Sequence, residues 1–191
     1  MAIYPNKAHN KKSLTRTVLP SSEPVSLADV KLFLRIDSTD FDSLLDRHIT
    51  SAREWLENYL HRSFISQTHV LSCDYLENGM ELPNPPITSI TSVTIHKNDG
   101  TDSTWSTDNY FLFNNKLMFS QNADTSVSTR SNFGFSITYV AGYSGNVASC
   151  IKDAIMRLVA SLHENNCFSP EILDEVKMLV SSEKIYQIGA V

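Results

Sequence analysis

Three aspartates near the N-terminus carry side chains that bind calcium in other proteins, but their spacing does not suit that ion. Asp37, Asp40 and Asp42 lie close together in the sequence. An EF-hand loop needs oxygen ligands at regular positions over about twelve residues, with a glycine in the middle, and no glycine follows here. We interpret residues 37–40 as capping groups at the beginning of a helix, where acidic side chains are favourable.

The histidines do not have the spacing of a zinc site. His163 is followed by Glu164, and an HExxH metalloprotease motif would need a second histidine where the chain has Cys167. His61 and His69 flank the passage from a predicted helix to a predicted strand. Zinc needs three or four converging ligands, so we expect no metal site.

Other catalytic and cofactor motifs are missing as well. The six glycines form neither GxGxxG nor GxxxxGK[ST], the loops that hold nucleotide phosphates. Cys73, Cys150 and Cys167 are odd in number and form no CxxC pair. With no apolar signal region and no apolar run near the roughly 20 residues of a membrane span, we expect a chain made in the cytoplasm, with no membrane, no cofactor and no catalytic residue.

Aromatic side chains could stack on bases or sugars, and we considered six of them. Their periodic placement is more typical of a hydrophobic core. Only Lys116 and Arg130 interleave with the aromatics of the β region, which argues against nucleic-acid binding. The six residues are Trp55, Tyr59, Phe111, Phe113, Phe133 and Phe135.

The spacing of apolar residues along the chain indicates an α+β fold with a helical core. Apolar residues recur at helical spacing over about 26–35, 41–61 and 147–165, and the two long helices should pack antiparallel. Ser26 is expected to cap the first helix. Ser169–Pro170 begins a C-terminal helix within 168–191, because proline is tolerated in a first turn.

An antiparallel β subdomain is expected over about 64–140, inserted between the helices. Between residues 87 and 138 there are 18 Ser or Thr residues and only seven charged ones, which favours strands. Asn98–Asp99–Gly100 predicts a hairpin turn, and Asn114–Asn115 a second one. The core domain, helices and β subdomain together, would thus span residues 23–167.

Residues 1–22 are expected to form a basic extended arm. They carry Lys7, Lys11, Lys12 and Arg16 and no acidic residue. The segment therefore has a charge of +4, and the rest of the chain has a charge of −9, which gives the overall −5. An acidic body argues against a protein that grips duplex DNA, since phosphate contacts need clustered cations. The arm would contact a partner or DNA, or it would be a solvated tail.

Four segments in fixed order resemble a known family. Residues 23–37 (EPVSLADVKLFLRID) are similar to the opening of phage gp6-like head-tail connectors and of the related phiE125 gp8-like proteins. The similarity continues through 40–57, the proline turn and strand at 82–93, and the closing strand and helix at 139–155. It covers about residues 18–165, whereas 1–17 extend beyond the usual start and 168–191 lack the usual aromatic and arginine ending.

The resemblance implies a structural head-tail connector, or adaptor, and no enzyme. Such a subunit would form a homo-oligomeric, dodecameric or similar ring in the virion neck, contacting the portal and the stopper or tail proteins. DNA would pass through its lumen during genome packaging without sequence-specific binding. The implied portal contacts lie in the C-terminal helix and tail: Ile172, Val176, Leu179, Tyr186 and Ile188.

Three alternatives remain open at this point. The C-terminal helix could pack back on its own domain. The chain could be another neck component, such as a stopper or tail-completion protein. It could also be a β-domain module that binds glycans or proteins as an isolated monomer.

Overall fold

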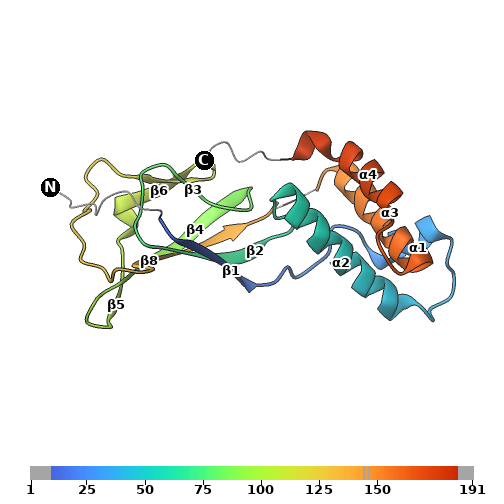
Figure 1. Cartoon of the computed structure of the whole chain (residues 1–191), viewed down its shortest axis with the longest axis horizontal. Helices are drawn as coiled ribbons and strands as arrows, with labels where there is room; N and C mark the ends of the chain where they lie inside the picture. The colour runs from blue at the N-terminus through green and yellow to red at the C-terminus, as the bar shows by residue number, and fades with distance from the viewer. Residues whose placement is uncertain (1–9, 144, 146, 185–191) are drawn as a thin grey trace. The chain divides into compact units, whose positions relative to one another are not determined.

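The computed structural model covers the whole chain and describes residues 10–143, 145 and 147–184. The chain divides into two compact units, which we treat separately. The sheet unit combines Met1–Leu19 with Ser66–Gly142, and the helical unit combines Pro20–Ile65 with Tyr143–Val191. The strands belong to the former and the helices to the latter (Figure 1). The expected α+β fold class is confirmed.

Two antiparallel sheets build the sheet unit. The larger sheet has the strand order β1-β2-β8-β4-β5, and the smaller one β3-β7-β6. The strands are β1 (Lys12–Val18), β2 (Gln67–Cys73), β3 (Met80–Glu81), β4 (Ile87–His96), β5 (Asp102–Thr104), β6 (Tyr110–Phe113), β7 (Lys116–Phe119) and β8 (Phe135–Ala141), with a 3-10 turn, η1, at Thr107–Asn109.

Both predicted hairpin turns are present. Between β4 and β5, Asp99 accepts a 2.9 Å hydrogen bond from the backbone N of Thr101, and Gly100 has a φ of +82°, which its missing Cβ allows. Between β6 and β7, Asn114 and Asn115 both have positive φ, as a two-residue hairpin turn requires.

Alternation of apolar and polar residues places the core of the sheet unit on one face of the larger sheet. Leu71 of β2 and Ile137 and Tyr139 of β8 are at most 1% exposed, and they cluster with Leu117 of β7. The smaller sheet therefore helps to cover the inner face. The outer face carries Ser, Thr and Val at the alternate positions, since neighbouring side chains of a strand point to opposite faces.

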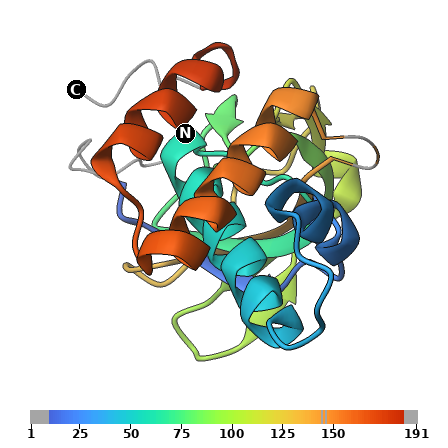
Figure 2. The ribbon, with the colours of Figure 1, turned by 90° about the vertical axis from the view of Figure 1, so that its right-hand side faces the viewer.

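Four helices form the helical unit in the described residues. They are α1 (Leu27–Leu34), α2 (Asp42–Leu60), α3 (Ser149–Asn165) and α4 (Pro170–Leu179), followed by a 3-10 turn, η2 (Ser181–Glu183). α3 packs along α2, and it also contacts α1 and α4, which lie on different sides of it (Figure 2). Leu45 and Leu56 of α2 and Ile151 and Ile155 of α3 are fully buried between the helices.

Two of the predicted helix N-caps are present, and a third is not. Ser26 caps α1 and forms a capping box with Asp29, and Ser169 caps α4. The acids and hydroxyls of residues 37–40 do not cap α2. The N-cap is Phe41, which makes no side-chain cap bond, and Asp42 in the first turn instead accepts a 2.7 Å bond from Lys31. An ion pair between α1 and α2 has taken the place of a local cap.

The basic arm expected over 1–22 contains a strand. Residues Lys12–Val18 pair antiparallel with β2 as the edge strand of the larger sheet, with Leu14 opposite Leu71 and Thr15 opposite Val70. All seven residues are exposed, so the pairing depends on backbone hydrogen bonds rather than side-chain burial. That explains why no periodic pattern revealed it.

Candidate interaction surfaces

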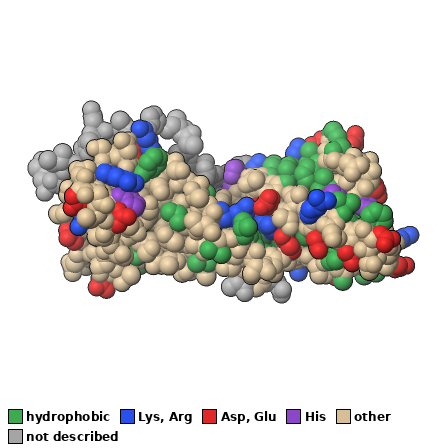
Figure 3. All heavy atoms as spheres, turned by 90° about the horizontal axis from the view of Figure 1, so that it is seen from below, with side chains coloured by type: hydrophobic (Ala, Val, Ile, Leu, Met, Phe, Trp, Pro, Cys, Tyr) green, Lys and Arg blue, Asp and Glu red, His purple; other side chains and the backbone are tan. Residues whose placement is uncertain are grey.

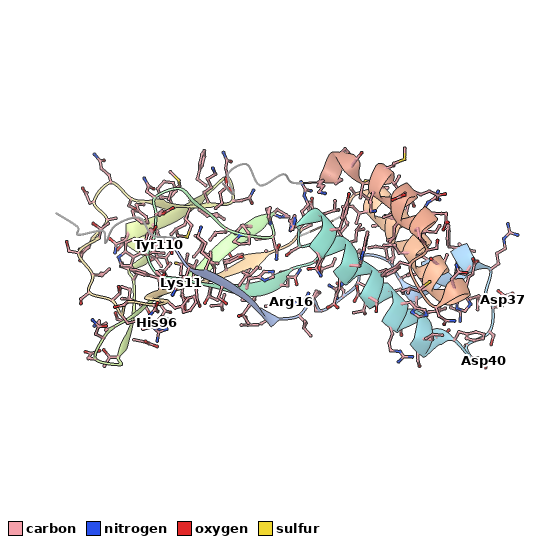
Figure 4. The ribbon with its side chains drawn as sticks, in the orientation of Figure 1. Lys11, Arg16, Asp37, Asp40, His96 and Tyr110 are labelled. Atoms are coloured by element: carbon pink, nitrogen blue, oxygen red, sulfur yellow. The ribbon has the colours of Figure 1, made fainter. Side chains whose placement is uncertain are left out.

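The basic residues of the N-terminal segment lie on and beside β1 (Figure 4). Lys11 donates from its backbone N to Asp74 and from Nζ to Asn132, and Arg16 donates to the side-chain oxygen of Gln67. Lys12 is exposed on the strand, while Lys7 lies outside the described residues. Three of the four expected arm cations are thus held at a sheet edge.

The side chain of Asn10 fastens the beginning of this segment. Its Nδ2 donates to the carbonyl of Tyr75 at 2.9 Å, and its Oδ1 accepts from the backbone N of Asp74 at 3.1 Å. Both partners follow directly after β2. These bonds hold Asn10 beside the end of β2.

The C-terminal helix packs on its own unit. Val176 and Val180 are fully buried in the helical core, and Ile172 is half-buried against it. Leu179 is 37% exposed, and Tyr186 and Ile188 lie outside the described residues. Of the five expected portal contacts, Val176 stabilises the fold of the subunit and Leu179 reaches the surface.

The described chain ends against α2. Arg62 donates to Glu183 at 2.9 Å and also to the hydroxyl of Tyr143. Nζ of Lys184 lies 4.3 Å from the ring centroid of Tyr59, a cation-π contact. These contacts hold η2 beside the C-terminal end of α2.

Trp55 and Tyr59 pack against the helical core, as their periodic placement in the sequence indicated. Their rings stack with centroids 5.4 Å apart, and Trp55 also contacts the ring of Phe168. Both side chains are half-buried against the helical core. They join α2 to the chain that leads into α4.

Apolar side chains of α1 project into solvent. Leu32 is 81% exposed and Phe33 48% exposed, whereas Val30, on the side of the helix opposite Leu32, is fully buried. Figure 3 shows hydrophobic patches on the helical unit. The sequence contained a signal for this surface: Leu32–Phe33–Leu34 is a run of three apolar residues, and one face of a short helix cannot bury all of them.

A second exposed apolar residue lies on α4. Met178 is 79% exposed, and it shares a helix face with Glu171 and Asp174, which precede it by seven and four residues. The side chains around it are acidic. This face points away from the core that Val176 occupies.

In the smaller sheet, two aromatics expected to be core are at the surface. Phe111 and Phe113 are 48% and 57% exposed, whereas Tyr110, on the other face of the same strand, is buried. Across β7, Phe111 lies opposite Met118 and Phe113 opposite Lys116. Every residue of β6 is aromatic or aliphatic, so alternation could not tell which face is inside.

The outer face of the larger sheet carries a chain of hydrogen bonds that no motif in the sequence indicated. Nδ1 of His96 is 2.7 Å from Oδ1 of Asp102, and Nε2 is 2.8 Å from Oγ of Ser136. Oγ of Ser136 is 3.2 Å from Oγ of Ser72. The residues come from β5, β4, β8 and β2, with His96 at the end of its strand (Figure 4).

An Asp-His-Ser chain resembles a hydrolase triad in its bonding, but its setting differs. A triad works with backbone N–H donors aimed at the developing oxyanion. Ser136 lies within β8, which is paired on one side with β2 and on the other with β4, so the surrounding N–H groups are used in the ladders. The chain joins strands across the sheet.

The described residues contain neither a metal-binding cluster nor a membrane-spanning helix. Across residues 10–143, 145 and 147–184, no group of three or more His, Cys, Asp or Glu side chains is arranged to hold a metal ion. Among the helices that the structure describes, none combines the length and hydropathy that a membrane crossing requires. The exposed apolar side chains of α1, α4 and β6 are the candidate interaction surfaces.

Comparison with known proteins points the same way. A search of curated proteins finds no match. The sequence model of the phage gp6-like head-tail connector proteins matches residues 24–126, which is more than half of the chain.

Solved structures share the fold over almost the whole chain. A protein in the neck of an empty gene transfer agent (GTA) particle, computed with C6 symmetry, superposes with a TM-score of 0.77 at 15% identity, covering 94% of this chain and 98% of that one. A protein in the neck of the native GTA particle, computed with C12 symmetry, gives 0.70 at 14% identity, covering 94% and 98%. One in the native GTA virion gives 0.74 at 14%, covering 93% and 98%.

The family match includes elements of both units, since the matched residues contain α1, α2 and the strands β2 to β7. This chain belongs to the phage gp6-like head-tail connector family and is a structural connector subunit of a phage-like particle.

Proposed function

We propose that twelve copies of the chain form a ring in the neck of the virion, below the portal. There it joins head to tail and extends the channel through which DNA passes. The observation that carries the proposal is the family match over residues 24–126. The fold shared with a neck protein of a particle computed with C12 symmetry supports the stoichiometry.

The charge of the subunit suits a channel that conducts DNA. The chain carries a net −5, and residues after the N-terminal segment account for all of the negative charge. A wall of the same sign as the phosphates does not retain the duplex. We expect DNA to pass without sequence-specific binding, and we expect no enzymatic activity.

The partner surfaces are assigned by their position in the chain. The portal contact involves α4 and the residues after it, with Ile172, Leu179, Tyr186 and Ile188 as contacts and Val176 holding the helix in place. A short apolar segment that becomes ordered on its partner is a common mode of recognition. The stopper or tail proteins would meet a different surface.

Electron microscopy of purified portal mixed with the full chain tests the proposal. We expect an additional ring below the portal with twelvefold symmetry. If the portal acquires no ring, the proposal is wrong. Binding only to a portal that already carries another ring would instead identify a stopper or tail-completion protein.

Truncation after Lys184 tests the portal contact separately. The shortened chain keeps α4 and the ion pair between Arg62 and Glu183, so we expect it to fold and to lose portal binding. A chain with Lys7, Lys11, Lys12 and Arg16 all changed to Gln tests the basic segment. Loss of DNA retention in assembled particles would support a contact with DNA, and unchanged particles would rule that contact out.

A further inference from the structure

We propose that neighbouring subunits contact each other through two different helices, the exposed face of α1 on one subunit and the exposed face of α4 on the next. The inference rests on the proposed ring and specifies its lateral contact. The partner is a second copy of this chain, placed head to tail.

The α1 face combines apolar side chains with a cation at its C-terminal end, while the exposed Asp29, whose carboxylate accepts a hydrogen bond from Ser26, lies at the N-terminal end of the helix. Ala28, Leu32 and Arg35 are spaced by four and three residues, so they lie on one side of the helix, and all three are exposed. Phe33 lies beside them, 48% exposed. Arg35 ends the helix in a left-handed conformation, which places a positive charge at one end of the apolar patch.

The α4 face has the complementary composition. Met178 is 79% exposed, and Glu171 and Asp174 on the same side of the helix are exposed as well. Lys177 pairs with Asp174 at 3.0 Å and Arg157 of α3 with Glu175 at 3.1 Å. Because α4 carries three acids and one base, one acid remains in excess even when Arg157 is counted. An apolar side chain is therefore flanked by negative charge.

The helical core fixes these two faces in place. Val30 of α1 and Val176 of α4 are both fully buried, so each helix is anchored with its other side in solvent. Both helices contact α3, and they lie on different sides of it (Figure 2). One rigid unit thus presents two unlike surfaces in different directions.

This arrangement suits a closed ring better than a twofold dimer. A ring closes when each subunit offers a donor surface and a different acceptor surface. In the proposed contact Leu32 and Phe33 pack on Met178, and Arg35 approaches Asp174 and Glu171. A twofold contact between α1 faces would bring Arg35 near its own copy and would leave the α4 face uncovered.

Two single substitutions test the pairing in the full chain. Leu32→Glu and Met178→Glu change side chains about four-fifths exposed, so folding should persist, which circular dichroism would verify. We expect each variant alone to lose the ring. Mixed together, they should form a dimer that grows no further, because only the intact α4 of the first and the intact α1 of the second can meet.

Charge reversal and a matched control sharpen the result. Arg35→Glu should raise the subunit concentration needed for half-assembly by about tenfold, and adding Asp174→Arg should restore most of it. Phe113→Glu, an exposed aromatic of the sheet unit, is the control and should leave assembly unchanged. Equal effects of the control and of Leu32→Glu would overturn the inference.

Crosslinking covers the case in which rings form only on the portal. In a background with Cys150 and Cys167 changed to Ser, Leu32→Cys with Met178→Cys should give a ladder of covalent oligomers with a short bis-maleimide. Each single cysteine variant should give none. Portal-bound rings without a ladder would refute the α1 to α4 contact while leaving the proposed function standing, whereas absence of rings from the wild-type chain would refute the proposed function itself.

Discussion

Arg53 and Glu57 form an ion pair inside the helical unit, one turn apart on α2, with Nη1 and Oε2 2.8 Å apart. Arg53 also donates from Nε to Glu23, in the segment before α1, at 2.7 Å. Glu57 accepts from the backbone N of Phe64, in the chain that leaves α2, also at 2.7 Å. One buried pair therefore connects α2 with the segment before α1 and with the chain that follows α2.

Removing the cation of this pair should destabilise the subunit strongly. Arg53→Met leaves Glu57 buried without its counter-charge, and such a change costs about 3 kcal/mol of unfolding free energy. Urea unfolding measures the loss. Arg157→Met is the control, because the Arg157–Glu175 pair is about half exposed and is worth less than about 1 kcal/mol. Similar losses in the two variants would contradict the structural role of Arg53.

The stability of the sheet unit should fall in mildly acidic solution because of His69. Burial, together with the nearby positive charge of Arg16, lowers the pKa of His69. The folded state then binds fewer protons than the unfolded state, so stability is full above the unfolded pKa of about 6.5 and is lost as the pH falls below it.

Replacing the titrating ring tests this assignment. His69→Gln should reduce the loss of unfolding free energy between about pH 7 and pH 5, measured by denaturant titration at each pH. His61→Gln, at an exposed position, controls for removal of a histidine. A pH dependence of His69→Gln identical to that of the wild-type chain would show that His69 is not the group responsible.

The three cysteines should differ in reactivity. Burial raises the pKa of the Cys73 thiol to about 12, so almost no thiolate, the reactive form, is present near neutral pH. Cys167 is exposed and Cys150 half-buried. With a thiol reagent on the native protein, mass spectrometry should find Cys167 modified first and Cys73 only after unfolding. Rapid native labelling of Cys73 would show that the core of the sheet unit opens readily.

Ser136 should behave as a structural hydroxyl. A fluorophosphonate probe, which labels activated serines, should leave it unmodified, because β8 is paired on both sides and its backbone N–H groups are used in the ladders with β2 and β4 rather than aimed at an oxyanion. Ser136→Ala should cost about 1 kcal/mol, as expected for a lost hydrogen bond. Covalent labelling of the wild-type chain that disappears in Ser136→Ala would instead indicate hydrolase chemistry.

Local patterns predicted the helices and both tight turns. The amphipathic stripe of α2 and α3, the N-cap at Ser26, and the proline in the first turn of α4 each involve residues within a few positions of one another. The same holds for the hairpin turn at Gly100. Interactions of this range leave their mark on the sequence itself.

Contacts between distant segments could not be read in this way. β1 buries no side chain, so its sequence has no sustained apolar pattern, and its partners on β2 are 50 to 61 residues away along the chain. The hydrogen-bonded chain of His96, Asp102 and Ser136 needs three strands in register. Neither feature has a local signal.

Periodicity, capping and turn chemistry are local properties, so they were enough to predict the α+β class and the order of most elements, and the family resemblance was visible in four short segments. Which apolar residues remain outside the core depended instead on the packing of the folded chain. In three elements one apolar or aromatic residue is exposed while a similar residue nearby is buried. The exposed residues are Leu32 of α1, Met178 of α4 and Phe111 of β6, and their buried counterparts are Val30, Val176 and Tyr110. The reason is that burial depends on which face of an element meets its neighbours, and those neighbours are brought together only by the fold.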